Sequence, residues 1–213
     1  MPRKAEPQLH ARILQAARTL FVKGGEKGLS MRSLAKVART NTPAVYRRFH
    51  NRNAILRALA DQYRHNAFEV MEPCNSLPEM AEALLELALR SPREYELFYS
   101  ELISKVPGAR LNFEFAKKRC AEWIGGDAED HVELLLALAA LVHGTAMMLI
   151  SKAIPPQSEA KMHLVFTAAV RVLLQEAASL RGSAQFSKEN SDDSVTLNSP
   201  AAGAGASSTH GQG

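Results

Sequence analysis

A cluster of short and basic side chains between residues 42 and 48 has the composition of a nucleic-acid-binding surface. Val45 and Phe49 are four residues apart, so on a helix both side chains point inward. The outward positions then belong to Thr42, Ala44, Arg47 and Arg48. Small and basic side chains on one face suit a helix that enters a DNA major groove. The chemistry indicated is recognition of DNA rather than the making or breaking of bonds.

Two capped helices would position these side chains. Ser30 is a candidate N-cap, because its hydroxyl can accept a bond from an amide of the first turn. The apolar residues that follow recur at i, i+3, i+4 and i+7: Met31, Leu34, Ala35 and Ala38. Asn41 offers a second N-cap, and Pro43 lies in the first turn, where its missing N–H costs nothing. Residues 30–49 therefore form a predicted helix-turn-helix.

The charge of the chain is distributed unevenly. Residues 1–66 hold fourteen Lys and Arg against three acids, a net charge of +11, whereas the remaining 147 residues carry a net −7. A basic stretch is usually a solvated surface. Because this one coincides with the helix-turn-helix pattern, we interpret it as a phosphate-binding surface.

A further helix precedes this motif. Its apolar stripe has a period of 3.6 residues and consists of Ile13, Leu14, Ala17, Leu20 and Phe21. Gly24 and Gly25 follow as a natural helix stop. We expect this helix to cover the back of the two shorter ones, and a long linking helix to begin near Arg52.

Several short motifs in this head point to one family. They are Ile13 to Phe21, Gly28-Leu29-Ser30, Leu34-Ala35, Val45-Tyr46-Arg47-Arg48-Phe49 and Ile55-Leu56. Through them, residues 9–65 resemble the TetR family of bacterial one-component regulators. The resemblance implies a DNA-binding domain at residues 7–67 and a helical effector-binding and dimerisation domain at residues 68–181. Separately, the two unpaired cysteines, Cys74 and Cys120, fit a reducing cytosol, so we expect a cytoplasmic protein.

The resemblance assigns roles to single residues. Tyr46 matches a family tyrosine that contacts a phosphate, with simple packing as the alternative; Arg52 replaces a lysine that holds a phosphate at a helix N-terminus. Arg47 is a candidate for reading a guanine edge with its forked guanidinium, and a phosphate contact is its alternative. The predicted DNA-binding residues are Ser30, Arg32, Thr40, Asn41, Thr42, Pro43, Ala44, Tyr46, Arg47 and Arg52.

Besides Arg52, three residues of the head depart from the family pattern. Arg39, Thr40 and Asn53 stand where the family usually has Gly, Val and Glu. If position 39 needs a left-handed backbone, Arg costs about 1 kcal/mol more than Gly. These departures affect the geometry of the turn, not the fold.

The rest of the chain is predicted to be all-α. Pro and Gly breaks separate segments of helical length, and no long run alternates polar and apolar residues. Leu134 to Val142 is apolar on nearly every side, and Met162 to Leu180 has a broad apolar face. We expect one side of these helices to face the core and the other a second subunit. A membrane span is the weaker interpretation, because the nine-residue run is short and His143 interrupts its continuation.

By the same resemblance, the last two long helices form the interface of a homodimer. Two identical heads match a palindromic operator in double-stranded DNA. Two segments, Ser91 to Phe98 and Ala140 to Ala146, also resemble the WHG-type C-terminal domain of some family members, although Val142 replaces the usual Trp.

Aromatic and Met side chains in this region suit a small apolar effector with a polar handle. The candidate lining residues are Tyr95, Phe98, Tyr99, Phe113, Trp123, His143, Met147 and Met148. Ordinary core packing is the alternative for each of them.

Enzyme chemistry has little support in the sequence. Cys74 and Cys120 do not form a Cys-x-x-Cys motif, and the histidines lack the spacing of metal ligands. We therefore expect neither a catalytic site nor a metal or other cofactor. Residues 182–213 are rich in Ser, Gly and Ala, which predicts a disordered tail. The sequence thus predicts a homodimeric, ligand-released repressor; the alternative is an all-α ligand-binding or scaffold protein that has lost specific DNA binding.

Overall fold

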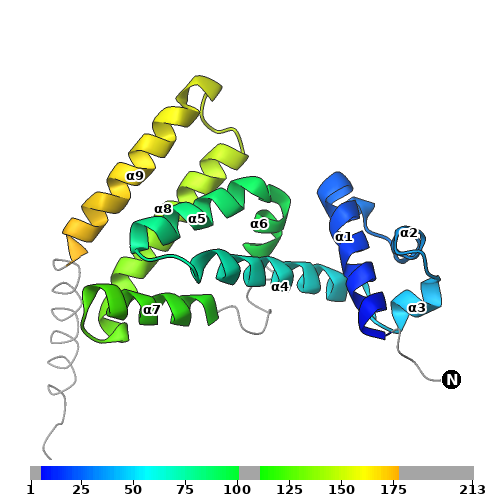
Figure 1. The fold of residues 1–213 in the computed structure, drawn as a ribbon. Coiled ribbons are helices and arrows are strands. Elements are labelled where there is room, and N and C mark those ends of the chain that lie inside the picture. Colours follow the sequence, from blue (N-terminus) through cyan, green and yellow to red (C-terminus); the bar gives the residue numbers. More distant parts are fainter. Residues whose placement is uncertain (1–5, 101–110, 178–213) are drawn as a thin grey trace, which may run out of the picture.

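The computed structural model describes residues 6–100 and 111–177, and the predicted tail at 182–213 lies outside them. All regular elements of the described residues are helical, as the sequence predicts. The α-helices are α1 (Glu6–Gly28), α2 (Met31–Val37), α3 (Thr42–Tyr46), α4 (Arg52–Met71), α5 (Leu77–Arg90), α6 (Pro92–Phe98), α7 (Leu111–Ile124), α8 (Val132–Ile150) and α9 (Glu159–Gln175). Two 3₁₀ turns, η2 (Ala128–His131) and η3 (Pro156–Ser158), precede α8 and α9. Figure 1 shows α1–α3 at one end of α4 and the remaining helices toward its other end.

Side-chain caps begin the short helices of the head. The Ser30 hydroxyl accepts a hydrogen bond from the Ser33 N–H at 3.0 Å, and the Ser33 hydroxyl accepts one from the Ser30 N–H at 3.0 Å. Asn41 Oδ1 accepts from the Ala44 N–H at 2.9 Å. Both predicted N-caps are therefore confirmed, and each satisfies an amide that has no partner within its helix.

The turn between α2 and α3 requires a left-handed residue. Arg39 has φ of 51°, and the N–H of Thr40 bonds back to the Ala35 carbonyl at 2.9 Å. The N–H of Arg39 bonds to the Lys36 carbonyl at 3.3 Å, which completes the pair of bonds of a Schellman helix end. Arg39 thus occupies the position at which glycine is usual.

The head has its own apolar core. Ile13, Leu34, Val45 and Ile55 are fully buried, one from each of α1 to α4. Phe49 is buried as well, so the inward positions predicted for Val45 and Phe49 are confirmed. The helical geometry of α1 is interrupted at Gly25, whose φ is 58°, close to the predicted stop.

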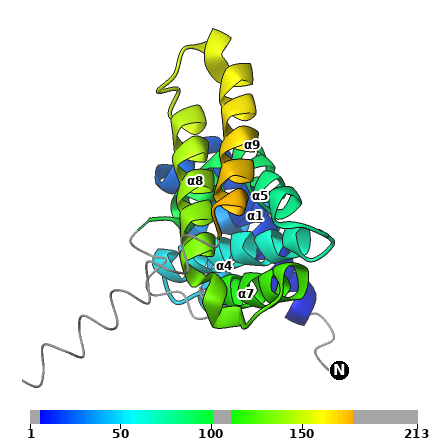
Figure 2. The ribbon, with the colours of Figure 1, turned by 90° about the vertical axis from the view of Figure 1, so that its left-hand side faces the viewer.

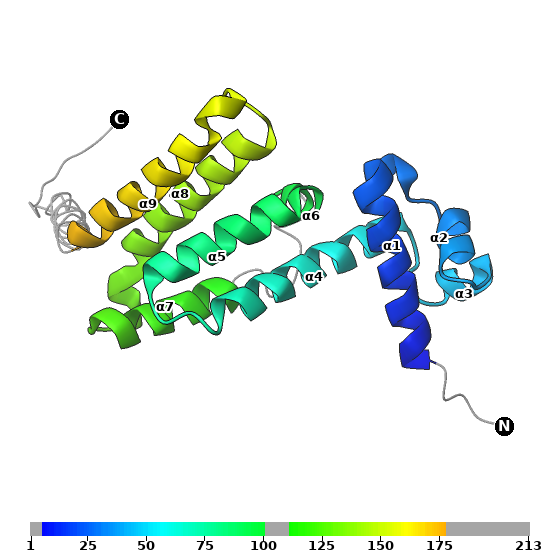
Figure 3. The same cartoon turned by 45° about the horizontal axis from the view of Figure 1, so that its top comes forward.

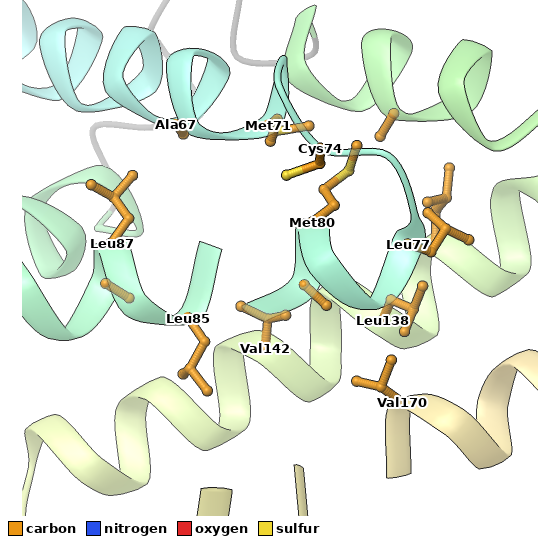
Figure 4. Packing of buried hydrophobic residues seen from close by; sticks show 14 of the residues in the cluster. Ala67, Met71, Cys74, Leu77, Met80, Leu85, Leu87, Leu138, Val142 and Val170 are labelled. Carbon is orange, nitrogen blue, oxygen red and sulfur yellow. The ribbon is translucent and has the colours of Figure 1, made fainter. Parts of the chain in front are cut away.

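Two core clusters divide the molecule along α4. The head cluster reaches Ala60, and the cluster of the body begins at Tyr63 on the same helix. In the body, α5 packs against α4 and α8. Figure 4 shows side chains from these helices and from α9, such as Met71, Met80, Val142 and Val170, pointing toward one another. A single continuous helix therefore takes part in both cores.

Helices α8 and α9 pack side by side on the body (Figure 2) and lie away from α2 and α3 (Figure 1). By length and composition alone, the stretch Ala128–Ile150 could cross a membrane. It is longer than the nine-residue apolar run on which the sequence-based argument against a membrane span rests. However, Leu134, Leu138, Val142 and Ala146 of α8 are buried in the core of the body. This packing is that of a core helix in a folded domain.

Candidate nucleic-acid interface and body cavity

The outer surface of α3 presents the side chains expected of a DNA-reading helix. Tyr46 is 49% exposed, and Pro43 and Arg47 are also exposed. The side chains of Tyr46 and Arg47 make no hydrogen bond within the described residues, so both are available to a ligand. Arg32 on α2 is exposed beside them in the fold, because α2 and α3 pack together.

The predicted outward position of Ala44 is wrong. This residue was expected on the outward face, but only 3% of it is exposed. The short helix directs Ala44 and Val45 together toward the interior. Ala44 is therefore not positioned to contact a base edge, whereas Thr42 and Thr40 are partly exposed.

The cap residues and Arg52 have structural partners already. The side chains of Ser30 and Asn41 are exposed but occupied by their capping bonds. Arg52 lies in the first turn of α4 and donates from Nη2 to Glu26 Oε2 at 3.0 Å. A phosphate approaching Arg52 would have to share this guanidinium with Glu26. Because Glu26 is far from Arg52 in the sequence, helical spacing could not identify this ion pair.

The body contains a partly open apolar cavity of about 280 Å³. Helices α4, α5, α6, α7 and α8 all contribute to its wall. Its lining residues are Tyr63, Ala67, Met71, Leu77, Met80, Ala81, Leu84, Tyr95, Phe98, Tyr99, Asn112, Phe113, Ala116, Leu135, Leu138, Ala139 and Val142. An apolar cavity with a few polar groups is the usual form of a small-molecule site.

Four of the eight predicted pocket residues line this cavity: Tyr95, Phe98, Tyr99 and Phe113. The other four do not. Trp123 lies under the guanidinium of Arg119, 4.6 Å from the ring centre, and Met148 is exposed on α8. Met147 packs against the core of the body. His143 lies behind the wall, where its Nδ1 is 2.8 Å from the Tyr95 hydroxyl oxygen.

Two polar lining residues, Tyr63 and Asn112, were missed. Tyr63 lies in the series Ala60, Tyr63, Ala67 and Met71, an apolar stripe that continues from the head along α4. That periodicity was readable in the sequence. Asn112 carried no such signal, because a single Asn at the start of a helix is more often a solvated end residue.

Burial keeps the tyrosine hydroxyls of the cavity neutral. It raises the pKa of Tyr63 and of Tyr95 well above the ordinary tyrosine value, and neighbouring Tyr99 acts in the same direction. The Tyr95 ring also contacts Tyr99 and His143, with ring centres 4.7 and 5.7 Å away. The polar groups of this wall are thus uncharged hydrogen-bonding groups.

The short helix α6 links the cavity to the head. Tyr95 and Phe98 line the cavity, whereas Leu97 belongs to the core of the head. Buried Glu94 accepts from Arg18 Nε of α1 at 3.1 Å. Arg93 donates to the carbonyl oxygens of Phe21 and Val22, also in α1. Figure 3 shows α6 at the end of the body nearest α1.

A basic head with an exposed helix-turn-helix, attached to a helical body, defines a class of protein: the DNA-binding transcriptional regulators. The comparisons with known proteins narrow this class. Residues 13–59 match the model of the N-terminal domain of "bacterial regulatory proteins, tetR family". The head of the chain thus carries the DNA-binding domain of the TetR family, as its motifs predict. No curated protein matches the sequence at a significant level.

Solved structures share the fold at low sequence identity. A TetR variant of Acinetobacter baumannii in complex with minocycline is 21% identical, with a TM-score of 0.55 over 79% of this chain and 96% of that one. The regulator SCO7222 of Streptomyces coelicolor is 18% identical, with a TM-score of 0.62 over 81% and 98%. The multidrug-binding protein EbrR in complex with imidazole is 21% identical, with a TM-score of 0.56 over 81% and 93%.

Proposed function

We propose that this regulator is a cytoplasmic homodimeric repressor, which a small apolar effector releases from a palindromic operator. The observation that carries the proposal is the position of α6. One helix of seven residues contributes Tyr95 and Phe98 to the cavity and Glu94 and Leu97 to contacts with the head. A ligand that displaces α6 would therefore act on the head directly.

The outer face of α8 and α9 supports a dimer. Leu136, Ala140, Gly144 and Met148 are four residues apart on α8 and all exposed. On α9, Leu164 is 72% exposed and Val165 60% exposed. An added Cβ at Gly144 would have no atom within 4 Å, so a partner helix has room to approach there. Exposed apolar side chains on two neighbouring helices favour association with a second copy.

The head supplies the DNA-binding half of the proposal. Two heads related by a two-fold axis would place two α3 helices in successive major grooves of a palindrome, about 34 Å apart. Tyr46 and Arg52 are proposed to contact phosphates, and Arg47 to read a base edge or a phosphate. Arg32, Thr40, Thr42 and Pro43 are proposed to contact DNA around them.

The body supplies the effector-binding half. Structural relatives have been solved with minocycline and with imidazole bound, which supports a ligand role for the cavity of this chain. An effector weakens DNA binding only if its affinity is higher for the form of the protein that does not fit the operator than for the form that does. Displacement of α6 through Tyr95 and Phe98 would provide that difference, because Glu94 and Arg93 would move relative to α1.

The direct test is a titration of the protein against DNA from upstream of its own gene. The +11 charge of the first 66 residues predicts an affinity that falls steeply with salt, because bound phosphates release counterions. We expect one fragment to bind more tightly than the others, with two protected half-sites. Weak binding to all fragments with no dependence on salt would leave the alternative, a ligand-binding or scaffold protein without specific DNA binding.

A further inference from the structure

A second cleft, separate from the apolar cavity, lies where the head meets the body. One wall is the junction of α5 and α6, residues 90–94. The other wall is one face of α1, formed by Gln15, Arg18, Thr19, Val22 and Lys23. Figure 3 shows α1 between α6 and the short helices α2 and α3. The cleft therefore lies on the body side of α1, away from the helix proposed to read DNA.

This junction cleft is strongly basic. Among the described residues that line it, the only acid is Glu94, against the four cations Arg18, Lys23, Arg90 and Arg93, which gives a net charge of +3. Glu94 is buried and accepts from Arg18 Nε at 3.1 Å, so its charge is already paired. Lys23 and Arg90 are exposed and make no hydrogen bond or ion pair within the described residues. Charges of one sign gathered in a cleft attract a ligand of the opposite sign.

Two guanidinium groups of the junction cleft are held in place by the protein. Arg93 Nη1 donates to the carbonyl oxygens of Phe21 and Val22 of α1, and Arg18 Nε donates to Glu94. A guanidinium has five N–H donors, so these bonds leave several donors of each group for a ligand. An oriented guanidinium can donate to two oxygens of one phosphate group.

Ser91 adds a polar group between the two walls. Only 9% of Ser91 is exposed, and it lines the junction cleft beside Arg90. Its side chain makes no capping bond and no other hydrogen bond within the described residues. The hydroxyl is not among the fully buried polar atoms without a partner, so it keeps some accessible surface. A largely buried hydroxyl gains a partner when a ligand oxygen approaches it.

We propose that the junction cleft binds a phosphomonoester, a small molecule that carries a terminal phosphate dianion. Two negative charges match the excess of cations better than the single charge of a carboxylate. The oxygens of one phosphate can accept from the head through Arg18 and from the body through Arg90 and Ser91. A phosphate of the operator is disfavoured, because α1 separates the cleft from α3. This site is independent of the apolar cavity and goes beyond the proposed function.

Isothermal titration calorimetry without DNA, at pH 8 and constant ionic strength, tests the proposal with glycerol 3-phosphate, glycerate and glycerol. A phosphomonoester is a dianion at this pH, because its second pKa is about 6. The polar hydroxyls of all three probes disfavour the apolar cavity. We expect glycerol 3-phosphate to bind at least about tenfold more tightly than glycerate, and glycerol not to bind. Equal affinities of the two anions, or no binding of glycerol 3-phosphate, would overturn the proposal.

Arg90→Gln identifies the site. It should weaken binding of glycerol 3-phosphate by about tenfold, whereas Arg90→Lys should keep most of the affinity. Arg57→Gln is the matched control, because Arg57 is exposed on α4 outside the junction cleft; it should leave binding unchanged. Circular dichroism verifies the fold, and Lys23→Gln provides the same test if Arg90→Gln does not fold.

Equal weakening by Arg90→Gln and Arg57→Gln would indicate general attraction to a basic surface and overturn the site. Duplex DNA provides a further arm. If glycerol 3-phosphate does not bind but Arg90→Gln weakens DNA binding more than Arg57→Gln does, the cleft contacts the nucleic-acid backbone and the proposal fails. The calorimetry uses neither operator nor cavity ligand, so its failure would leave the proposed repressor function standing.

Discussion

The head and the body present their polar groups in opposite ways. Tyr46 at the end of α3 and Arg47, which follows it, are exposed and make no hydrogen bond within the described residues. In the body, Tyr63, Tyr95 and the Asn112 oxygen are buried around an apolar cavity. Binding at the head should therefore depend on charge and fall with salt, whereas binding in the body should depend on apolar burial and be nearly independent of salt. The two regions are connected by α4 and α6, and variants can separate their contributions.

The largest effect is expected from a charge on the outer face of α9. Leu164→Glu would place an unpaired carboxylate in the proposed dimer interface and yield monomers, measured by analytical ultracentrifugation. Loss of the second half-site should weaken operator binding by roughly 100-fold.

Ile124→Glu is the matched control, because Ile124 on α7 is 41% exposed outside this face. We expect it to leave both the dimer and operator affinity unchanged. A Leu164→Glu protein that remains dimeric would locate the interface elsewhere.

The next largest effect concerns α3. Arg47→Ala should cost about 1–3 kcal/mol of binding free energy and relax the preference at one base pair if Arg47 reads guanine. Tyr46→Phe should weaken binding to all sequences alike, because a phosphate contact carries no sequence information. Binding-site selection with each variant measures this. An Arg47→Ala protein with its preference intact would assign Arg47 to a phosphate.

Alkaline pH should affect the body through its buried tyrosines. The pKa of Tyr63 is raised in the folded state, so above pH about 10 the unfolded chain loses a proton that the folded one keeps. This contribution to stability is complete below that pH and is lost at about 1.4 kcal/mol per pH unit as the pH rises.

Urea unfolding between pH 9 and 11 gives the slope. Tyr63→Phe should reduce it, whereas Tyr46→Phe on the exposed face of α3 should leave it unchanged. Equal slopes in the two variants would mean that the hydroxyl of Tyr63 is not desolvated in solution.

The smallest effect is expected in the turn of the head. Arg39→Gly should raise the free energy of unfolding by about 0.5–1 kcal/mol, because glycine tolerates the φ of 51°. Arg39→Ala loses the same charge but keeps the strain, so it should not stabilise the protein. If thermal unfolding shows that Arg39→Ala is as stable as Arg39→Gly or more stable, the result would contradict the Schellman geometry of this turn.

Local signals in the sequence were sufficient for the head. Ser30 and Asn41 cap the helices that they precede, so the caps and the inward Val45 follow from neighbouring residues, whereas the family resemblance indicated the turn at Arg39. Ala44 was misplaced because α3 is only five residues long. Over so short a helix, periodicity does not separate an inward from an outward small residue.

The cavity depends on contacts between distant segments, and the sequence predicted it less well. Tyr95, Phe98 and Phe113 were expected from residue type, but so was Trp123, which instead packs against Arg119. Asn112 reaches the cavity because its amide bonds to Arg64, 48 residues earlier in the chain. No local pattern reports such a contact. The domain boundary at residues 67 and 68 remains a prediction, although both cores meet between Ala60 and Tyr63 on α4.

The coupling between DNA binding at the head and ligand binding in the body tests most directly whether the cavity controls the head. Operator affinity should be measured by fluorescence anisotropy with and without a ligand that binds the cavity, and ligand affinity with and without operator. We predict that the ligand lowers operator affinity and that the operator lowers ligand affinity by the same factor, as linkage requires. Equal ligand affinities in the presence and absence of operator would contradict the claim that the cavity controls the head.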